Sequence, residues 1–562
     1  MGCIVYLKIL FKTETGGITM INGAQAMVEC LKKEGVSVMF GYPGAVICPF
    51  YDAVYEDGSI DHILVRQEQN AGHEASGYAR ISGEVGVCVV TSGPGATNLI
   101  TAIATAYLDS VPIVAITGQV RRDQLGKDVF QEVDITGAVE PFVKHSYLIK
   151  DANEIPRIFK EAFHIASTGR PGPVLIDVPM DVQLDELESF EYPEKVNIIG
   201  YKPSTKGNPI QVKKALSVIS EAKKPVICIG GGIINAKACD ELRSFVEKTG
   251  IPVVSTMMGL SAMPSNHKSF IGMIGMHGTP AANKAVSNAD TVIIIGARVG
   301  DRAVKSPQAV FDGAKIVHID VDPAEIGKNV QVFVPIVGDA KIILSDIAGK
   351  CDYACPQEWQ DEVSGYKRDY LESLTARADI EGFVNPVKFL RALSDKMPEK
   401  SVVAADVGQN QIWTCNHFEI KEGRLLNSGG MGTMGYSVGA AIGAKLASPD
   451  CPVVAICGDG SFQMQMMELA TLVQHGIDVK VVIMRNKNLG MIREIQRNLY
   501  KSRHIASNLD GSPDFVALAN AYGIPARSIG SNAEIDSAVD EMLATKGPYL
   551  LQCMVSSEQP SL

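Results

Sequence analysis

The sequence has no excess of basic residues, no dense cysteine framework and no long apolar run. Its 63 Asp and Glu residues outnumber 52 Lys and Arg residues, giving a net charge of −11. This balance disfavours general binding to nucleic acid or to anionic membranes. A membrane-spanning helix needs about 20 apolar residues, and no stretch approaches that length. The twelve cysteines are scattered, which is typical of a reducing compartment. We therefore expect a soluble, cytoplasmic protein that acts on small molecules.

The length leaves room for two to four domains of ordinary size. With 562 residues, 46% of them hydrophobic and 20% charged, the chain can bury sizeable cores, which argues against extended disorder. The first 19 residues contain an apolar stretch, but Lys8 interrupts it and no small-residue cleavage site follows. We interpret residues 1–19 as an irregular leader segment that precedes Met20.

Short apolar runs, each followed by a helical pattern, recur along the chain. Runs that are apolar on both faces are typical of parallel strands covered by helices on each side. The sequence therefore predicts an α/β fold of doubly wound parallel sheets, with ligands at the carboxyl ends of the strands. The runs that carry this prediction are residues 86–93, 111–118, 173–179, 225–232, 291–297, 315–320, 453–460 and 479–486.

Two breaks in this pattern divide the chain into three units. Residues 184–210 hold charges, Pro, Ser and Gly with little periodicity, which indicates a linker. Residues 351–385 are charged and predict a helical connector. Three α/β units remain, at about 20–185, 205–350 and 380–562, each of usual domain size.

The most informative motif is GDGS at 458–461, together with Asn486 in the segment RNKNLGM. Asp459 closes one apolar run and Asn486 closes the next, with a predicted helix at 465–475 between them. Adjacent parallel strands would place both side chains at one edge of the sheet, where their oxygens suit Mg²⁺. A helix N-terminus after Ser461 would offer N–H groups to a diphosphate. Taken alone, an Asp-Gly pair is more often a simple turn.

These segments resemble the acetolactate (acetohydroxyacid) synthases, a branch of the thiamine-diphosphate enzymes. The resemblance runs from Met20 to the end of the sequence and is more specific for the cofactor than for the substrate. It is carried by GDGS with the distant Asn, and by the segments GYPGAVICPFYDAV, RQEQNAGHEASGYAR, TSGPGATNLITAIATAYLDSVPIVAITGQV, FQE, GRPGPVLIDVP and SGGMGTMGYSVGAAIGAKLA.

The resemblance implies that Glu68 is catalytic. A buried carboxyl that donates to the coenzyme's pyrimidine nitrogen favours the imine form that activates the thiazolium carbon, and burial would raise its pKa. The simpler alternative is a Glu stabilised at the positive end of a helix. The resemblance further implies that Met434 bends the cofactor, that the Gly432 carbonyl accepts from it, and that the remaining contacts come from Gly44, Gln409, Asn410, Asp459, Gly460, Ser461, Gly490 and Met491. Asp459, Asn486 and Asn488 are the implied metal ligands.

The middle unit resembles the version of the family that binds FAD. Three glycines after an apolar run permit close approach to a phosphate, although one Gly-rich turn is usually structural. The flavin would be structural, because the net carboligation transfers no electrons to it. The implied contacts are Arg170, Gly230, Gly231, Gly232, Thr256, Met257, Met276, His277, Gly278, Thr279, Gly296, Ala297, Arg298, Asp320 and Asp339.

The positions near the substrate depart from the biosynthetic family. Gln67, Met180 and Asn410 stand where the family has His, Lys and His, and Ile495 replaces a Trp that favours 2-ketobutyrate as acceptor. Loss of that indole removes a large wall from the site. Arg302 matches the residue that receives the acceptor carboxylate, although an ordinary surface Arg is as good an interpretation. Further implied substrate contacts are Val46, Phe130 and Gln131.

The resemblance implies an activity and an assembly. Pyruvate would be decarboxylated, and its two-carbon unit joined to a second 2-keto acid, giving 2-acetolactate when the acceptor is pyruvate. The first unit of one chain and the third unit of another would share each site, so we expect at least a homodimer, and a small regulatory subunit is conceivable. Two alternatives stay open: a related decarboxylase or C–C hydrolase with another acceptor, and a catalytically silent nucleotide-binding subunit.

Overall fold

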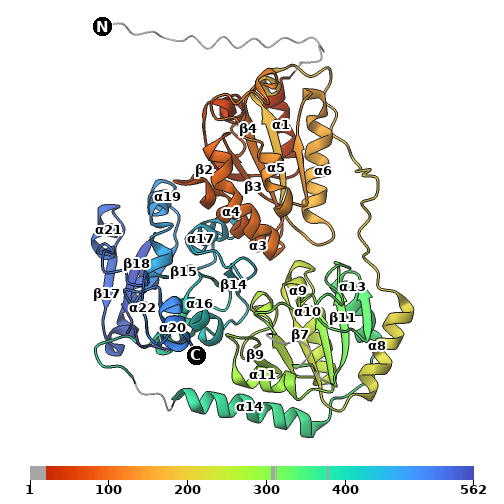
Figure 1. Ribbon diagram of the computed structural model, residues 1–562, viewed down its shortest axis with the longest axis vertical. Helices are drawn as coiled ribbons and strands as arrows, with labels where there is room; N and C mark the ends of the chain where they lie inside the picture. The colour runs from red at the N-terminus through yellow and green to blue at the C-terminus, as the bar shows by residue number, and fades with distance from the viewer. Residues whose placement is uncertain (1–20, 305–309, 312, 376–378) are drawn as a thin grey trace.

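The computed structural model describes residues 21–304, 310, 311, 313–375 and 379–562, which form three six-stranded parallel sheets flanked by helices (Figure 1). This architecture confirms the predicted α/β class with three parallel sheets. The leader predicted for residues 1–19 lies outside the described residues. Among the helices of the described ranges, none is both long and apolar enough to cross a membrane.

The first sheet has the strand order β2-β1-β3-β4-β6-β5. Its strands are β1 (Val38–Tyr42), β2 (Asp61–Leu64), β3 (Gly86–Val90), β4 (Ile113–Gln119), β5 (His145–Leu148) and β6 (Val174–Pro179). Its helices are α1 (Gly23–Lys33), α2 (Cys48–Asp57), α3 (Glu68–Ser82), α4 (Pro94–Asp109), α5 (Ile135–Val139), α6 (Ile155–Ser167) and α7 (Met180–Leu184).

The third sheet repeats the strand order of the first, as β14-β13-β15-β16-β18-β17. Its strands are β13 (Val402–Ala405), β14 (Arg424–Asn427), β15 (Val453–Gly458), β16 (Lys480–Arg485), β17 (Ala526–Ile529) and β18 (Tyr549–Met554). Its helices are α15 (Pro386–Lys396), α16 (Gln409–His417), α17 (Ser437–Ala447), α18 (Asp459–Phe462), α19 (Leu469–Gln474), α20 (Gly490–Leu499), α21 (Phe515–Ala521) and α22 (Ile535–Ala544).

The middle sheet has a different order, β12-β11-β10-β7-β8-β9, which is the 3-2-1-4-5-6 arrangement of dinucleotide-binding sheets. Its strands are β7 (Pro225–Ile229), β8 (Val253–Ser255), β9 (Phe270–Met273), β10 (Thr291–Ile295), β11 (Lys315–Asp320) and β12 (Val334–Val337). Its helices are α8 (Pro209–Glu221), α9 (Gly231–Asn235), α10 (Cys239–Thr249), α11 (Pro280–Ser287) and α13 (Ala340–Lys350).

Burial on both faces explains why the strands read as continuous apolar runs. In β3, Val87 and Val89 belong to one hydrophobic cluster, while Cys88 and Val90 belong to another on the opposite face. Each of the eight predicted runs overlaps a strand of one of the three sheets. Edge strands such as β5 and β17 were not named from the sequence, because they are short and partly exposed.

The two segments between the sheets are of different kinds. No helix begins between the end of α7 and the start of α8, and this stretch runs along one side of the molecule in Figure 1. Helix α14 (Gln357–Thr375) lies in the charged connector before the third sheet (Figure 1). Trp359 of this helix is buried and donates to the Pro225 carbonyl at 2.9 Å, so the helix packs on the middle sheet.

Helices α3 and α17 join the first sheet to the third through an unusually close crossing (Figure 1). A Cβ on Gly77 would overlap the Ala440 carbonyl, and a Cβ on Gly443 would overlap the Glu74 carbonyl. Tyr436, just before α17, shares a hydrogen bond of 3.1 Å with Ser76. Glycine at the contact therefore lets the two backbones touch, which fixes α3 relative to the third sheet.

Candidate active site

Asp459 and Asn486 lie at the same edge of the third sheet, as predicted. They follow β15 and β16, which are adjacent and parallel. Asp459 is 1% exposed, and its carboxylate accepts from Gly460 N at 3.0 Å and from Lys487 N at 2.6 Å. Burial raises the pKa of Asp459 to about 6, although the two N–H groups oppose this shift. The backbone around Asp459 thus holds an oxygen ligand where a divalent cation could bind.

The helix at this edge begins earlier than predicted. Helix α18 starts at Asp459 rather than after Ser461 and has only four residues. The reason is local capping, because Ser461 Oγ accepts from Gly458 N at 3.1 Å. A Cβ on Gly460 would lie 2.7 Å from a Leu489 methyl and 3.5 Å from Met434 Cε. Gly460 therefore brings Met434 close to the Asp459 loop.

Amide side chains connect the carboxyl end of β16 to α16. Asn486 Nδ2 donates to Gln409 Oε1 at 3.0 Å, and Asn488 N donates to Asn486 Oδ1 at 3.0 Å. Asn410 donates to the Asp406 carbonyl at 2.7 Å and to the Ile456 carbonyl at 3.2 Å. The structure thus groups the predicted diphosphate-side residues, and it gives Asn410 a backbone-bracing role within this chain.

Asp406 organises the loop that carries Gly432 and Met434. It is fully buried and accepts from Gly435 N at 3.0 Å and from Ser437 N at 2.9 Å. Gly432 and Gly435 have φ values of 72° and 88°, which favour glycine. Sequence reasoning missed Asp406, although its place at the end of the run SVVAAD was a usable signal.

A cavity of about 1140 Å³ opens where the three units meet. It is lined by side chains from the first unit, the middle unit and the third unit. Met434 and Leu489 both line it and lie beside Gly460 of the Asp459 loop. The predicted site residues that line it are Arg170, Gly231, Gly232, Thr256, Met257, His277, Gly296, Ala297, Arg298, Arg302, Asp320, Asp339, Gly432, Met434, Gly490, Met491 and Ile495.

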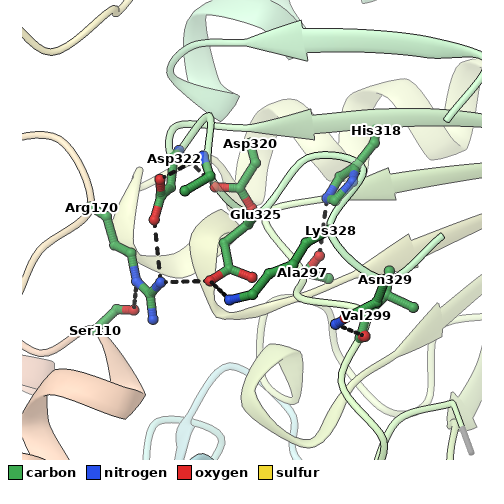
Figure 2. Close-up of polar contacts among 11 residues, drawn as sticks. Ser110, Arg170, Ala297, Val299, His318, Asp320, Asp322, Glu325, Lys328 and Asn329 are labelled. Atoms are coloured by element: carbon green, nitrogen blue, oxygen red, sulfur yellow. Dashed lines mark hydrogen bonds and ion pairs between the residues drawn. The ribbon is translucent and has the colours of Figure 1, made fainter. Parts of the chain in front are cut away.

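Figure 2 shows the polar contacts around Arg170, Asp320, Asp322 and Glu325, and all of these except Asp322 line the cavity. Arg170 donates to Glu325 at 3.0 Å, to Asp322 at 3.3 Å and to Ser110 Oγ at 2.9 Å, which ties the first unit to the middle one. Burial raises the pKa of Asp320 to about 6. Arg298 lines the same cavity, and burial lowers its pKa, with Arg170 adding to the effect. This part of the cavity therefore offers both carboxylates and guanidinium groups to a ligand.

The glycines of the middle unit are explained partly by packing. A Cβ on Gly230 would overlap the Gly296 carbonyl, and one on Gly232 would lie 2.6 Å from Gly296 Cα. Gly231 has more room, with the Met258 carbonyl 3.3 Å from such a Cβ. Gly230 is not among the cavity-lining residues. The structural interpretation thus accounts for Gly230, whereas Gly231 and Gly232 also face the cavity.

Four other predicted residues of the middle unit take local roles. Thr279 caps α11, and its Oγ1 accepts from Ala282 N at 3.2 Å. A Cβ on Gly278 would overlap the Met273 carbonyl. Met276 is 43% exposed, and its sulfur lies 3.4 Å from Arg302 Nη1. The Arg302 side chain is 69% exposed, so a substrate carboxylate could reach it.

Glu68 lies at the edge of the first sheet and does not line the cavity. It is the first residue of α3 and accepts from Asn98 Nδ2 at 2.9 Å. A Cβ on Gly95 would lie 3.5 Å from Glu68 Oε1 and 2.8 Å from a Thr91 methyl, and Gly44 also packs against Thr91. Within one chain, the structure therefore brings Gly44 and Glu68 together, and it does not bring Glu68 into the cavity beside Met434.

The predicted substrate contacts of the first unit surround the same edge. The Val46 carbonyl accepts from Gln183 at 2.9 Å, and Met180 begins α7 after β6. Gln131 has a φ of 60° and packs against Gly93 after β3. Phe130 is 86% exposed, which is unusual for a large aromatic side chain. At this edge Phe130 is thus open to solvent in the described chain.

Comparison with known proteins shows the family. Family models of thiamine pyrophosphate (TPP) enzymes match residues 21–138 (N-terminal TPP binding domain), 212–347 (central domain) and 406–553 (C-terminal TPP binding domain). The chain is 46% identical to the probable acetolactate synthase large subunit of Methanococcus aeolicus, covering 94% of this chain and 91% of that protein. It is 44% identical to the acetolactate synthase large subunit of Corynebacterium glutamicum, covering 93% and 84%.

The chain belongs to the acetolactate synthase family of thiamine pyrophosphate enzymes. The acetolactate synthase of Arthrospira platensis is also similar, at 44% identity over 96% of this chain and 95% of that protein. The family predicted from the sequence is therefore confirmed. The two matches described as TPP binding domains cover parts of the two sheets that share one strand order, namely β1 to β4 of the first sheet and most of the third.

Two further contacts in this acetolactate synthase family member were missed from the sequence. Asp109 accepts from Gly430 N at 2.6 Å, and Thr105 shares a hydrogen bond of 2.7 Å with Thr433. Both contacts tie α4 of the first unit to the loop before Met434. They join residues more than 300 positions apart, so no local pattern in the sequence could have indicated them.

Proposed function

We propose that this protein is a thiamine-diphosphate-dependent acetolactate synthase. It decarboxylates pyruvate and joins the two-carbon unit that remains to a second 2-keto acid, giving 2-acetolactate when that acid is pyruvate. The observation that carries the proposal is the pair of oxygen side chains, Asp459 and Asn486, at adjacent strand ends of a C-terminal TPP binding domain. The names of the relatives support the product.

The donor set fits Mg²⁺ and a diphosphate. Asp459 and Asn486 would bind the cation through side-chain oxygens, with Asn488 nearby, because Mg²⁺ prefers oxygen ligands together with substrate phosphates. Gly490 lets Gln409 approach Asn486, since any side chain at this position would overlap Gln409. Met434, held by the loop that Asp406 organises, would press on the cofactor from the cavity side.

The chain's acid–base residue in this proposal is Glu68. When bound, thiamine diphosphate supplies a carbon nucleophile and an electron sink for the loss of CO₂. Glu68 would hold a proton against the pyrimidine, with Asn98 fixing its carboxylate. Because Glu68 lies outside the cavity that Met434 lines, we propose that it completes the site of a second copy, as a homodimer or tetramer. The exposure of Phe130 supports a partner surface at this edge.

FAD fits the cavity between the units as a structural cofactor. The cavity is large enough to touch all three units, and it combines carboxylates for hydroxyl groups with Arg170 and Arg298 for phosphates. The middle sheet has the strand order of dinucleotide-binding sheets, with Asp320 at a strand end. Purified protein that is yellow and releases flavin on denaturation would support this assignment, and colourless protein would contradict it.

We propose that Arg302 binds the carboxylate of the acceptor and that Ile495 leaves room beside it. Both residues line the cavity that Met434 also lines. A small regulatory subunit remains part of the proposal, since several relatives are named large subunits. A cytoplasmic location is supported by the cysteines of the described residues, all eleven of which are free.

The test is product formation by the purified chain given pyruvate, Mg²⁺ and thiamine diphosphate. We expect one acetolactate and one CO₂ for every two pyruvates consumed. Equal amounts of CO₂ and aldehyde without acetolactate would instead indicate a decarboxylase. No consumption of any 2-keto acid, with cofactor bound, would indicate a catalytically silent subunit.

A further inference from the structure

Glu494 lies on α20 between the Asn486 loop and the segment 558–561. Its carboxylate accepts from Gln409 Nε2 at 3.1 Å, from Ser561 N at 3.4 Å and from Ser561 Oγ. Trp413 of α16 holds the same segment by donating to the Pro560 carbonyl at 2.9 Å. Glu494 is therefore placed firmly, although it touches neither Asp459 nor Asn486.

The chemistry of these groups fixes the direction of every hydrogen bond. An ionised carboxylate accepts and never donates, so Gln409 must turn its NH₂ group toward Glu494. The Gln559 carbonyl, which also only accepts, lies 3.1 Å from the same nitrogen. Both hydrogens of the Gln409 amide are thereby used. Its oxygen, Oε1, is left facing Asn486.

The orientation of the Gln409 amide determines the orientation of Asn486, the predicted metal ligand. Because Gln409 presents an oxygen, Asn486 must present its NH₂ group at 3.0 Å. Its carbonyl oxygen then points the other way, where Asn488 N donates to it at 3.0 Å. A turned Asn486 would offer the cation an NH₂ group, which is not a ligand for Mg²⁺. The orientation of one amide thus decides whether the site can bind metal.

We propose that Glu494 is a positioning residue that orients Asn486 for metal binding, through Gln409. This rests on the proposed metal site and names a residue on which that site depends. We call the hydrogen-bonded series Glu494–Gln409–Asn486 the relay. Tight packing supports it, because a Cβ on Gly490 would overlap Gln409 Oε1 and lie 2.7 Å from Asn486 Nδ2. No side chain can stand between the two amides. The neighbouring helix thereby acts on the cation without contacting it.

The experiment measures binding of Mn²⁺, as a probe for Mg²⁺, to the full chain with thiamine diphosphate, using the electron paramagnetic resonance signal of free Mn²⁺. Glu494→Met keeps the length of the side chain and removes the acceptor, so we expect the dissociation constant to rise about tenfold. Glu494→Gln keeps an acceptor oxygen and can donate to Ser561, so we expect less than a threefold change. Glu494→Ala is a second acceptor-free variant, should Glu494→Met fail to fold.

Glu558 provides a matched control on the same segment. It pairs with Arg497 at 2.9 Å and with Arg493 at 3.6 Å, and it does not touch Gln409. Glu558→Met should loosen the segment and change Mn²⁺ affinity less than twofold. If it weakened binding as much as Glu494→Met does, general loosening would explain the effect and the relay would be wrong.

The Asn486→Asp background tests the direction of the relay. The carboxylate introduced by this substitution and Gln409 Oε1 would both be hydrogen-bond acceptors. They would repel each other unless the Gln409 amide is free to turn its NH₂ group toward the carboxylate. In this background, Glu494→Met should weaken Mn²⁺ binding less than threefold, or strengthen it, whereas an equal tenfold loss in both backgrounds would overturn the relay. A native chain that binds no Mn²⁺ would overturn the metal site and the relay together. Native binding with all variants unchanged would overturn the relay alone.

Discussion

The first and third sheets have the same strand order, yet their carboxyl edges differ in chemistry. The edge of the third sheet is polar and closed, with Asp459 buried among N–H groups and Asn486 joined to Gln409. The edge of the first sheet carries Glu68, which accepts from Asn98 at 2.9 Å, and a nearly fully exposed Phe130. The same strand order thus places different side chains at the two edges.

We conclude that the strand order positions the loops and that the loop residues determine the chemistry. In each sheet a carboxyl residue begins a helix that follows a strand: Glu68 begins α3 after β2, and Asp459 begins α18 directly after β15. The middle sheet, with a different order, contributes walls to the cavity that the other two units also line. Three substitutions test how far the roles of the sheets differ.

The largest effect is expected from Glu68→Gln, which tests whether the two edges have separate roles. Loss of the acid should lower acetolactate formation by about 10² to 10⁴-fold, the usual contribution of a positioned acid–base group. Binding of Mn²⁺ with thiamine diphosphate should change little, because the proposed metal ligands, Asp459 and Asn486, lie on the third sheet. Asp459→Asn is the counterpart, and it should abolish metal binding. Equal loss of metal affinity in both variants would refute the division of roles.

The next effect concerns the contact that holds the two sheets together. Gly443→Ala should lower the melting temperature by several degrees, because the added methyl overlaps the Glu74 carbonyl and overpacking costs about 1–3 kcal/mol. Calorimetry would measure the change in melting temperature. Gly365→Ala in α14 is the control, since the nearest atom outside its helix backbone is 3.7 Å from the added Cβ. That control should be neutral or slightly stabilising. A neutral Gly443→Ala would show that the crossing tolerates separation.

The smallest effect is expected from Glu74→Met at the same crossing. Glu74 is fully buried, and neither of its oxygens has a hydrogen-bond partner among the described residues. Burial raises the pKa of its carboxyl well above the usual range, Glu468 adds to the shift, and Arg66 opposes it. In the unfolded chain the group ionises at a lower pH, so its cost to stability grows as pH rises above that value.

Glu74→Met removes this cost, so the gain in melting temperature should be a few degrees at pH 8 and smaller at pH 5. Melting curves across this range would test it. Glu468 is the matched control, because it accepts from Arg66 N at 3.0 Å and from Asn70 at 2.8 Å, and Glu468→Met should destabilise instead. A gain for Glu74→Met that does not depend on pH would contradict the ionisation argument.

Much of this architecture could be predicted, for reasons that particular residues illustrate. The run 453–460 is buried on both sides in a central strand, so its composition alone predicts β15. The edge strand β17 has only four residues, and three of them are partly or fully exposed, so its sequence carries little signal. The placement of Asp459 and Asn486 at one edge could be predicted because they follow neighbouring parallel strands. The role of Asp406 was not predicted, because its partners, Gly435 and Ser437, are distant in sequence.

The class of fold, the family and the residues at the strand ends could be inferred from the amino-acid sequence, because burial periodicity and short motifs are local properties of a chain. The crossing of α3 and α17, the carboxyl groups that share a cavity and the direction of the Asn486 amide became visible only in the packed molecule. These features depend on backbone contacts and on hydrogen-bond direction between segments that lie far apart in the chain. No local pattern encodes such contacts, because they exist only after the sheets have packed together.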